Sequence, residues 1–302
     1  MVGRSGSVQR TKLHEEEVDI DAGLVGRLIA TQFPESAHLP LAEVQSTGTV
    51  NAIYRLGDEL CVRLPRVEKW ALSLGRELHW LPRLAPYVSL RVPEPVASGL
   101  PASGYPFHWA IYRWIDGEPY RDDLVVDERK AAEDLARFVL ELRRAETVDA
   151  PRGGRRPLRE LGDLTRAALA ASRNAIDSDA ALAAWETALE APAWKGAAVW
   201  VHTDLLRPNV LVRSGSLAAV IDFGGVGIGD PAADVIAAWS VFGPVGRAAF
   251  RRALDVDDGT WRRARGYALH QAAMIIPYYA ETNPEFVALA ERTIDQILLD
   301  AE

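Results

Sequence analysis

The sequence predicts an α+β fold of two lobes, in which a small antiparallel β-sheet with one helix precedes a larger, mainly helical part. Three observations predict this fold. The first third of the chain is mixed and contains several strand-like runs, and Gly57-Asp58 between two of them indicates a hairpin. After Asp116-Gly117, apolar residues recur mostly at helical spacing. Within that helical half, strand-like runs are confined to residues 198–222.

The first lobe begins with a helix whose apolar residues, among them Leu24 and Leu28, lie one turn apart, and Pro34 ends it. The strand-like runs that follow are short and rich in Val, Leu, Ile and Tyr. A second helical pattern interrupts them. In order, we expect a helix over 21–33, strands over 41–44, 50–56 and 60–64, a helix over 73–84, and strands near 96–97 and 107–114.

The second lobe shows its strongest amphipathic pattern over residues 127–145. Asp230-Pro231 is typical of a helix start, with Asp as the N-cap and Pro in the first turn. Further helices are expected over 155–191, 260–283 and 284–301. The expected organisation is a flexible tail over 1–15, a first lobe over 16–112, a link over 113–117 and a second lobe over 118–302.

The composition excludes several classes of protein. Apolar residues make up 48% of the chain and charged residues 25%, which is typical of a folded soluble protein rather than a disordered one. The net charge of −8 disfavours a general nucleic-acid binder, because that class needs a basic face. Cys61 is the only cysteine, so no intrachain disulfide can form. With no membrane-spanning run and no signal-like start, we expect a cytoplasmic protein without nucleic-acid or membrane partners.

The stretch from residue 198 to 225 carries the chemistry. A strand-like run leads into His202-Thr203-Asp204, and a short loop then reaches Asn209. Two apolar runs around residues 214–216 read as a hairpin, which ends at Asp222-Phe223-Gly224. A turn centred between residues 215 and 216 predicts that Asn209 and Asp222 lie opposite each other. Amide and carboxylate oxygens are the ligands that Mg²⁺ prefers, and Asp204 is left to act as a base. A single Asp in a loop is usually a cap or turn residue, but this ordered set of residue types favours a functional site.

These residues resemble the catalytic and metal-binding loops of the aminoglycoside phosphotransferase family, whose members are relatives of protein kinases with a similar two-lobed fold. The resemblance covers roughly residues 20 to 300. It implies that Asp204 deprotonates the acceptor hydroxyl, and that Asp222 and Asn209 hold Mg²⁺ against the nucleotide phosphates. It also implies that His202 hydrogen-bonds the loop backbone, and that Asp230 and Asp234 support the catalytic loop. No zinc motif is present.

The nucleotide pocket implied by the resemblance departs from the protein-kinase pattern in two places. The expected phosphate loop, around Gly48, Thr49 and Asn51, has one glycine rather than three. Protein kinases place a lysine on the third strand, whereas Arg63 stands at the corresponding place here, in a chain with only four lysines. Arginine offers a fixed charge and a fork of donors to phosphate, and Glu77 on the following helix is its expected partner. A surface pair between the two is the alternative.

The segment AIYRWIDG, residues 110–117, resembles the link between the lobes. The backbone groups of Arg113 and Ile115 are expected to meet the edge of the nucleotide base. Tyr112 precedes the link, where its bulk narrows the inner pocket and favours guanine over adenine in some family members. Packing of Tyr112 within the sheet is the alternative. Either ATP or GTP therefore remains open as the co-substrate.

The sequence identifies the acceptor site less specifically than it identifies the phosphotransfer residues. The family places the acceptor opposite Asp204, between helices of the second lobe, where the candidates are Trp239, Gln271, Tyr278 and Glu281. An aminoglycoside is the first expectation and a macrolide the second. A sugar or amino-alcohol kinase shares every phosphotransfer residue and stays open. A nucleotide-binding pseudokinase that acts through interactions is the alternative from another class, although Asp204, Asn209 and Asp222 are all present.

Overall fold

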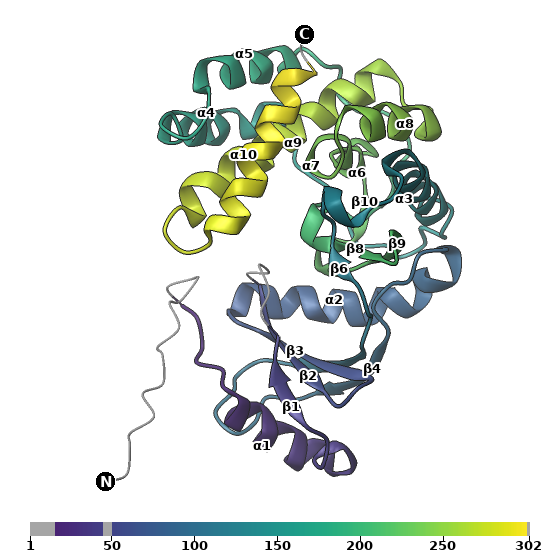
Figure 1. The fold of residues 1–302 in the computed structure, drawn as a ribbon, viewed down its shortest axis with the longest axis vertical. Coiled ribbons are helices and arrows are strands. Elements are labelled where there is room, and N and C mark those ends of the chain that lie inside the picture. The colour runs from purple at the N-terminus through teal and green to yellow at the C-terminus, as the bar shows by residue number, and fades with distance from the viewer. Residues whose placement is uncertain (1–15, 45–49, 301–302) are drawn as a thin grey trace.

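The computed structural model describes residues 16–44 and 50–300, and it confirms the predicted α+β class. In Figure 1 a part built on a β-sheet lies at the bottom and a mainly helical part lies above it. The predicted phosphate-loop residues Gly48 and Thr49 lie outside the described residues.

The lower part contains an antiparallel five-stranded sheet with the strand order β1-β2-β3-β5-β4. Along β2, Ala52, Tyr54 and Leu56 are buried and alternate with half-buried residues, as expected of a strand with a covered face. Gly57 turns the predicted hairpin with a φ of 59°, which glycine reaches without strain. The elements are α1 (Ala22–Gln32), β1 (Leu41–Glu43), β2 (Asn51–Leu56), β3 (Leu60–Pro65), α2 (Glu68–Leu84), β4 (Pro95–Gly99) and β5 (Trp109–Arg113).

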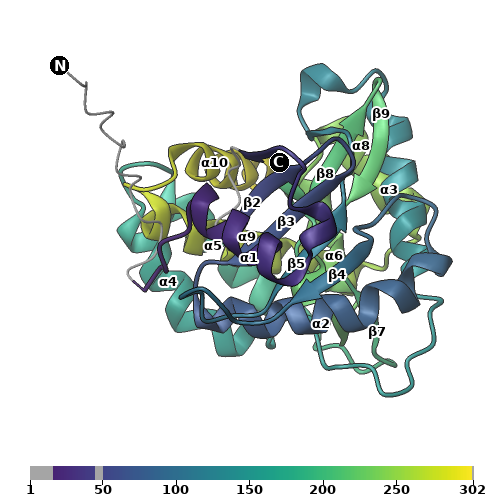
Figure 2. The same cartoon turned by 90° about the horizontal axis from the view of Figure 1, so that it is seen from below.

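The two faces of this sheet belong to different cores. Helix α1 covers one face, where Leu28 packs in a cluster with Tyr54 and Trp109. Helix α2 lies on the opposite face, between the strands and the helical part, while α1 lies across the strands on the outer side (Figures 1 and 2). Side chains on the α2 side, including Cys61 and Tyr112, belong to the core that continues into the helical part. The sheet therefore presents this face to the second lobe.

The upper part is organised around α9, which contacts α4, α5, α6, α7 and α10. Its strands form two small antiparallel sheets, in which β10 pairs with β7 and β8 lies between β6 and β9. Its helices are α3 (Glu128–Leu142), α4 (Gly162–Ala171), α5 (Ser178–Leu189), α6 (Ala232–Val235), α7 (Ala237–Ser240), α8 (Pro244–Leu254), α9 (Asp258–Tyr279) and α10 (Pro284–Leu299). Its strands are β6 (Glu118–Pro119), β7 (Val199–Val201), β8 (Val210–Arg213), β9 (Ser216–Val220) and β10 (Gly227–Gly229).

Several boundaries differ from the sequence prediction. Helix α2 begins at Glu68 rather than at residue 73. The sequence did not predict this first turn, because its residues are exposed or half-buried and show no apolar periodicity. The helix predicted from Asp230 forms the two short helices α6 and α7, and Pro244 then begins α8, which was not predicted. Strand β10 was also not predicted, since its sequence Gly-Ile-Gly carries no strand pattern.

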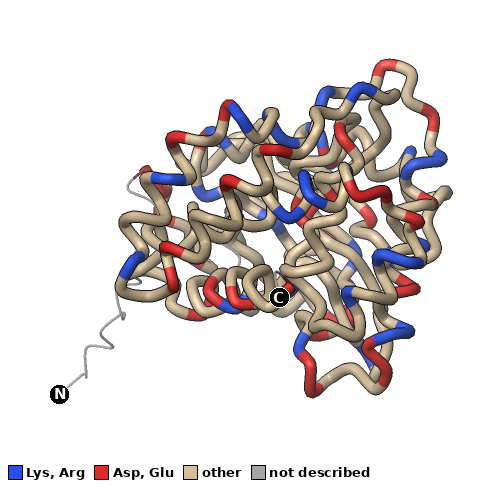
Figure 3. The backbone as a smooth tube through the Cα atoms, turned by 90° about the horizontal axis from the view of Figure 1, so that it is seen from above, with Lys and Arg blue, Asp and Glu red and all other residues tan. Residues whose placement is uncertain are grey.

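Charges of both signs are interspersed along the chain, without an extended run of one sign (Figure 3). Among the residues that the structure describes, no helix is both long and apolar enough to cross a membrane.

Candidate active site

The loop after β7 is held in place by Asp234, which is fully buried at α6. Its carboxylate accepts hydrogen bonds from the backbone N–H groups of His202, at 3.0 Å, and Thr203, at 2.8 Å. Thr203 has a φ of 78°, a left-handed conformation that strains a β-branched residue. Asp234 therefore fixes a strained turn directly before Asp204.

His202 connects the loop to the end of the hairpin. Its Nε2 lies 3.0 Å from the carbonyl oxygen of Ile221, and its Nδ1 accepts from the backbone N–H of Asp204 at 3.3 Å. A neutral imidazole protonated on Nε2 satisfies both contacts. The ring also packs edge-on against Phe223, with centroids 4.6 Å apart. His202 thus ties together the two segments that carry Asp204 and Asp222.

The carboxylate of Asp204 is held through both of its oxygens. Asn209 donates from Nδ2 to Oδ2 at 2.8 Å, and Gln271 of α9 donates from Nε2 to Oδ1 at 2.6 Å. Burial raises the pKa of Asp204, and the nearby charge of Asp222 raises it further, while the charge of Arg155 and the hydrogen bond from Gln271 oppose the rise. A carboxylate with a raised pKa is a stronger base than one in water. The structure brings Asp204, Asn209 and Gln271 together, all three from the sequence-derived set.

The hairpin register differs from the prediction by one residue. The backbone N–H of Ile221 donates to the carbonyl oxygen of Asn209 at 2.9 Å, so Asn209 faces Ile221 rather than Asp222. The turn is centred between Ser214 and Gly215, because Arg213 pairs with Ser216, and a one-residue register shift between Leu211 and Val212 offsets only part of this difference from the prediction. Asp222 lies one residue beyond, with φ 67° and ψ 68°. This left-handed conformation turns the chain at Asp222, whose side chain stays 32% exposed.

Arg63 links the sheet, α2 and the metal-binding loop. Its guanidinium contacts Glu77 at 2.5 Å and Asp222 at 3.5 Å. Glu77 is 1% exposed, and burial raises its pKa while the charge of Arg63 opposes the rise. The guanidinium carbon also lies 5.3 Å from the centroid of the Tyr112 ring. The Arg63–Glu77 pair is therefore buried between the two parts of the molecule and is not a surface pair.

The link after β5 offers fewer backbone groups than the sequence suggested. The N–H of Arg113 already donates to the carbonyl oxygen of Glu94 at 2.9 Å, so a bound base could meet only its carbonyl oxygen. Ile115 packs with Leu211 and Ala219 in a small apolar cluster below the link, and Ile221 lies against it. Asn51, from the predicted phosphate loop, begins β2 opposite Pro65.

One of the four predicted acceptor residues is wrong. Trp239 is fully buried, donates from Nε1 to Asp300 at 3.1 Å and packs against Trp261 with ring centroids 4.5 Å apart. It has no surface to offer a ligand. Tyr278 is 56% exposed near the end of α9, and Glu281 is exposed just beyond it. Tyr278 lies seven residues, or about 10 Å along the helix, from Gln271.

A small hollow opens beside the catalytic loop, between that loop and helices α9 and α10. Gln271 lines it and so connects it to Asp204. Its other polar lining groups are Arg207, Ser240 and Thr293, and no acidic side chain of the described residues lines it. The apolar side chains include Pro208, Ala272, Ile275, Phe286 and Leu289. The space next to the candidate base is therefore mainly apolar.

Arg155 was not among the sequence-derived candidates, yet it lies at the centre of the site. It donates from Nη2 to the carbonyl oxygen of Thr203 at 2.9 Å and to Oε1 of Gln271 at 2.6 Å. The segment before it runs against β10, where Gly153 donates to the carbonyl oxygen of Ile228 at 3.0 Å. A Cβ on Gly153 would lie 2.6 Å from Cα of Gly227, so this close approach requires glycine. In the sequence, the Gly153-Gly154 pair was the available signal.

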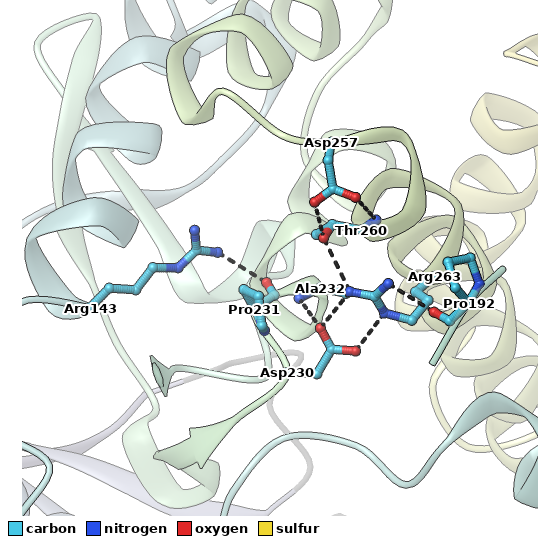
Figure 4. Close-up of polar contacts among 8 residues, drawn as sticks. All are labelled: Arg143, Pro192, Asp230, Pro231, Ala232, Asp257, Thr260 and Arg263. Carbon is cyan, nitrogen blue, oxygen red and sulfur yellow. Dashed lines mark hydrogen bonds and ion pairs between the residues drawn. The ribbon is translucent and has the colours of Figure 1, made fainter. Parts of the chain in front are cut away.

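Asp230 joins the segment after β10 to α9 (Figure 4). Its carboxylate accepts the N–H of Ala232 at 2.9 Å and forms a two-point ion pair with Arg263, at 2.7 and 3.1 Å. Arg263 also donates to Thr260 and to the carbonyl oxygen of Pro192, at 3.1 and 3.0 Å. The ion pair is almost fully buried, which makes its geometry well defined. It holds the helix that carries Gln271 against the catalytic part.

The fold is similar to that of several solved structures. Aminoglycoside 2′-phosphotransferase-IIIa with GDP aligns with a TM-score of 0.69 at 18% identity, over 92% of this chain and 98% of that one. The ADP-bound aminoglycoside phosphotransferase APH(2″)-Ib aligns with a TM-score of 0.60 at 20% identity, over 92% and 97%. Macrolide 2′-phosphotransferase MphH from Brachybacterium faecium, as the apoenzyme, aligns with a TM-score of 0.57 at 18% identity, over 91% and 98%. At these identities the likeness concerns the fold.

The sequence itself gives the family. The comparison with curated proteins found no match. The model of the phosphotransferase enzyme family matches residues 43–267, which is well over half of the chain. This range includes Arg63, Asp204, Asn209 and Asp222, the residues on which the site is built. The chain therefore belongs to the phosphotransferase enzyme family and is a phosphotransferase that acts on a hydroxyl group.

Proposed function

We propose that this phosphotransferase moves the γ-phosphate of ATP or GTP to a hydroxyl of a small, antibiotic-like molecule, with Asp204 as the base. The observation that carries the proposal is the state of Asp204, which is buried beside Asp222 and held through both oxygens by amide groups. A phosphoryl transfer needs such a positioned carboxylate more than it needs covalent chemistry. The GDP and ADP in two structural neighbours support a nucleotide as the donor.

Asp222 and Asn209 are the proposed ligands of Mg²⁺. Within the described residues, no group of three or more His, Cys, Asp or Glu side chains could hold a metal ion by itself. In this proposal the phosphate oxygens of the nucleotide supply the remaining ligands of the cation. The Asn209 amide nitrogen is occupied by Asp204, so its Oδ1 is the atom available to a hard cation. When bound, Mg²⁺ neutralises charge on the phosphates. Asp204 accepts the proton of the acceptor hydroxyl as the hydroxyl oxygen bonds to the γ-phosphorus, and the bond from that phosphorus to the bridging oxygen breaks to release the nucleoside diphosphate.

Arg63 is proposed to position the phosphates, with Glu77 holding its guanidinium in place. The purine base of the nucleotide is proposed to lie at the link. There it would meet the carbonyl oxygen of Arg113 and the backbone of Ile115, with Tyr112 at the inner wall of the pocket. Gly48, Thr49 and Asn51 remain the proposed phosphate-loop contacts. The contact of Arg63 with Asp222, at 3.5 Å, supports placing the phosphates beside both residues.

The acceptor is proposed to approach Asp204 from the side of the small hollow beside the catalytic loop, with Gln271 next to the base and Tyr278 and Glu281 toward the outside. An aminoglycoside carries several ammonium groups, each of which must be paired or stay hydrated. A macrolide presents a larger apolar surface. The hollow beside the loop has a volume of only about 20 Å³, room for roughly one water molecule, so its apolar lining does not distinguish between these classes.

The dependence of acceptor binding on salt separates these acceptor classes. If the acceptor is macrolide-like, its affinity should change little between about 10 and 150 mM NaCl, because apolar contacts are not screened. The affinity of a polycation should fall clearly over the same range. Isothermal titration with erythromycin and kanamycin, at both salt concentrations, measures this directly. Tight binding of kanamycin that weakens steeply with salt would support an aminoglycoside acceptor, and tight binding of erythromycin that is flat across this range would support a macrolide.

Replacing Arg63 by alanine should lower turnover by about 10- to 100-fold, because a charge-assisted contact to phosphate is lost. Lysine at the same position should restore part of the activity, since the charge remains but the fork is lost. Steady-state rates with ATP and GTP measure the effect. Thermal unfolding shows whether the buried Glu77, left without its partner, destabilises the alanine variant. Equal rates for wild type and the stable alanine variant would remove Arg63 from the nucleotide site.

A further inference from the structure

We propose that Gln271 and Arg155 form a unit that sets the orientation of the Asp204 carboxylate, an inference that rests on the proposed role of Asp204 as the base. Gln271 Nε2 lies 2.6 Å from Asp204 Oδ1, and Asn209 Nδ2 lies 2.8 Å from Oδ2. One donor comes from α9 and the other from the catalytic loop itself. Rotation of the carboxylate about its χ angles would break one or both of these bonds.

Arg155 determines which end of the Gln271 amide faces Asp204. A glutamine amide can be turned over, which would place Oε1 against the carboxylate and repel it. Arg155 can only donate hydrogen bonds, and its Nη2 lies 2.6 Å from Gln271 Oε1. That contact allows a single orientation, with Nε2 toward Asp204. Arg155 therefore acts on the base through the amide and makes no hydrogen bond to the carboxylate itself.

The position of Arg155 is in turn fixed by the backbone around it. The same Nη2 donates to the carbonyl oxygen of Thr203 at 2.9 Å, directly before Asp204. Gly153 and Pro151 are joined to Ile228 of β10 by backbone hydrogen bonds of 3.0 and 2.8 Å. Arg155 thus ties three separate segments together at the base: the loop before α4, the catalytic loop and α9.

The Gln271 amide lies between Arg155 and Asp204 and keeps the carboxylate available to the acceptor. An arginine in direct contact with Asp204 would bind the carboxylate in a two-point ion pair and occupy the oxygens that the acceptor hydroxyl needs. An amide N–H occupies one lone pair of Oδ1 and leaves the second available. The arrangement orients the base without neutralising it. Gln271 also lines the hollow, so it stands where the acceptor hydroxyl would approach.

The test uses the intact enzyme, with Mg²⁺·ATP and Mg²⁺·GTP as donors and water as the acceptor. Gln271→Met keeps the side-chain length and removes the donor, and Arg155→Met removes the cation that orients it. Each variant should lower kcat by about 10- to 100-fold, as expected when a reacting group is misplaced, while KM for the nucleotide stays within about twofold. Arg155→Lys should restore part of kcat, because it can still donate to Oε1. The double methionine variant should be no slower than the slower single variant, since the two residues act as a unit.

Arg166→Met, which removes an exposed ion pair with Glu186, is the matched control and should leave kcat unchanged. The thermal unfolding temperature of every variant is measured, so that a misoriented Asp204 carboxylate can be distinguished from a variant that fails to fold. Wild-type kcat in a folded Gln271→Met variant, a change in KM alone, or additive losses in the double variant would each overturn the inference while leaving the proposed function intact. A wild-type enzyme that consumes neither nucleotide would instead contradict the proposed function, and the inference with it.

Discussion

Replacing Asp204 with asparagine should lower turnover by about 10²- to 10⁴-fold while nucleotide affinity stays close to that of the wild type. The variant loses the group that accepts the hydroxyl proton. Nucleotide affinity should survive, because the phosphate-side contacts are assigned to Arg63 and Asp222. A smaller loss of stability should accompany the change, since the new amide nitrogen would face a donor from Asn209 or Gln271.

Turnover is followed with a coupled assay, nucleotide affinity by titration calorimetry, and stability by thermal unfolding. Asp163→Asn, a change at an exposed carboxylate on α4, is the matched control and should behave as the wild type. Near-normal turnover of the Asp204→Asn enzyme would show that the base lies elsewhere. Loss of nucleotide binding with an intact fold would show that Asp204 serves the nucleotide rather than the acceptor.

Replacing Asp222 with asparagine should weaken Mg²⁺-dependent nucleotide binding as well as turnover. The variant removes a charged oxygen ligand from a hard cation. The loss in metal affinity should exceed the roughly 10- to 100-fold that removal of an outer-shell partner costs. It also removes a negative charge that raises the pKa of Asp204, so the base should become weaker as well.

Nucleotide titrations at a series of Mg²⁺ concentrations, and in the presence of a chelator, measure the effect. The wild type and the Asp222→Asn variant should differ most at high Mg²⁺ and least without it. Asn209→Ala should shift the same Mg²⁺ dependence in the same direction, although by less, because an amide carries no charge. An unchanged Mg²⁺ dependence in the Asp222→Asn variant would remove Asp222 from the metal site.

The parts of the site that the sequence predicts well are those set by local chain geometry. The loop from His202 to Asn209 and the hairpin up to Asp222 follow one another directly, so their proximity needs only a strand, a turn and a second strand. The hairpin from β2 to β3 followed from Gly57-Asp58 in the same way. The pairing of Arg63 with Glu77 was also expected, although it depended on the resemblance to kinases as well as on the order of a strand and a helix.

The errors arise where distant segments decide the outcome. Trp239 follows Asp234 by little more than one turn, and the sequence does not say which side of that short stretch faces the core. The one-residue error at Asn209 arises because the hairpin turns at Ser214-Gly215, one residue earlier than predicted, and a bulge between Leu211 and Val212 compensates only in part. Arg155 was missed because its place depends on the contact between its segment and β10, a strand formed more than 70 residues later.

The most direct test of the proposed phosphotransfer is to follow the γ-phosphate itself by ³¹P NMR. The enzyme is incubated with ATP or GTP, with and without Mg²⁺, and with no acceptor other than water. We predict slow release of phosphate by the wild type in the presence of Mg²⁺, almost none without the metal, and almost none from the Asp204→Asn enzyme. Binding of the nucleotide without any consumption of the γ-phosphate, or equal consumption by the wild type and the Asp204→Asn enzyme, would contradict the assignment of Asp204 as the base.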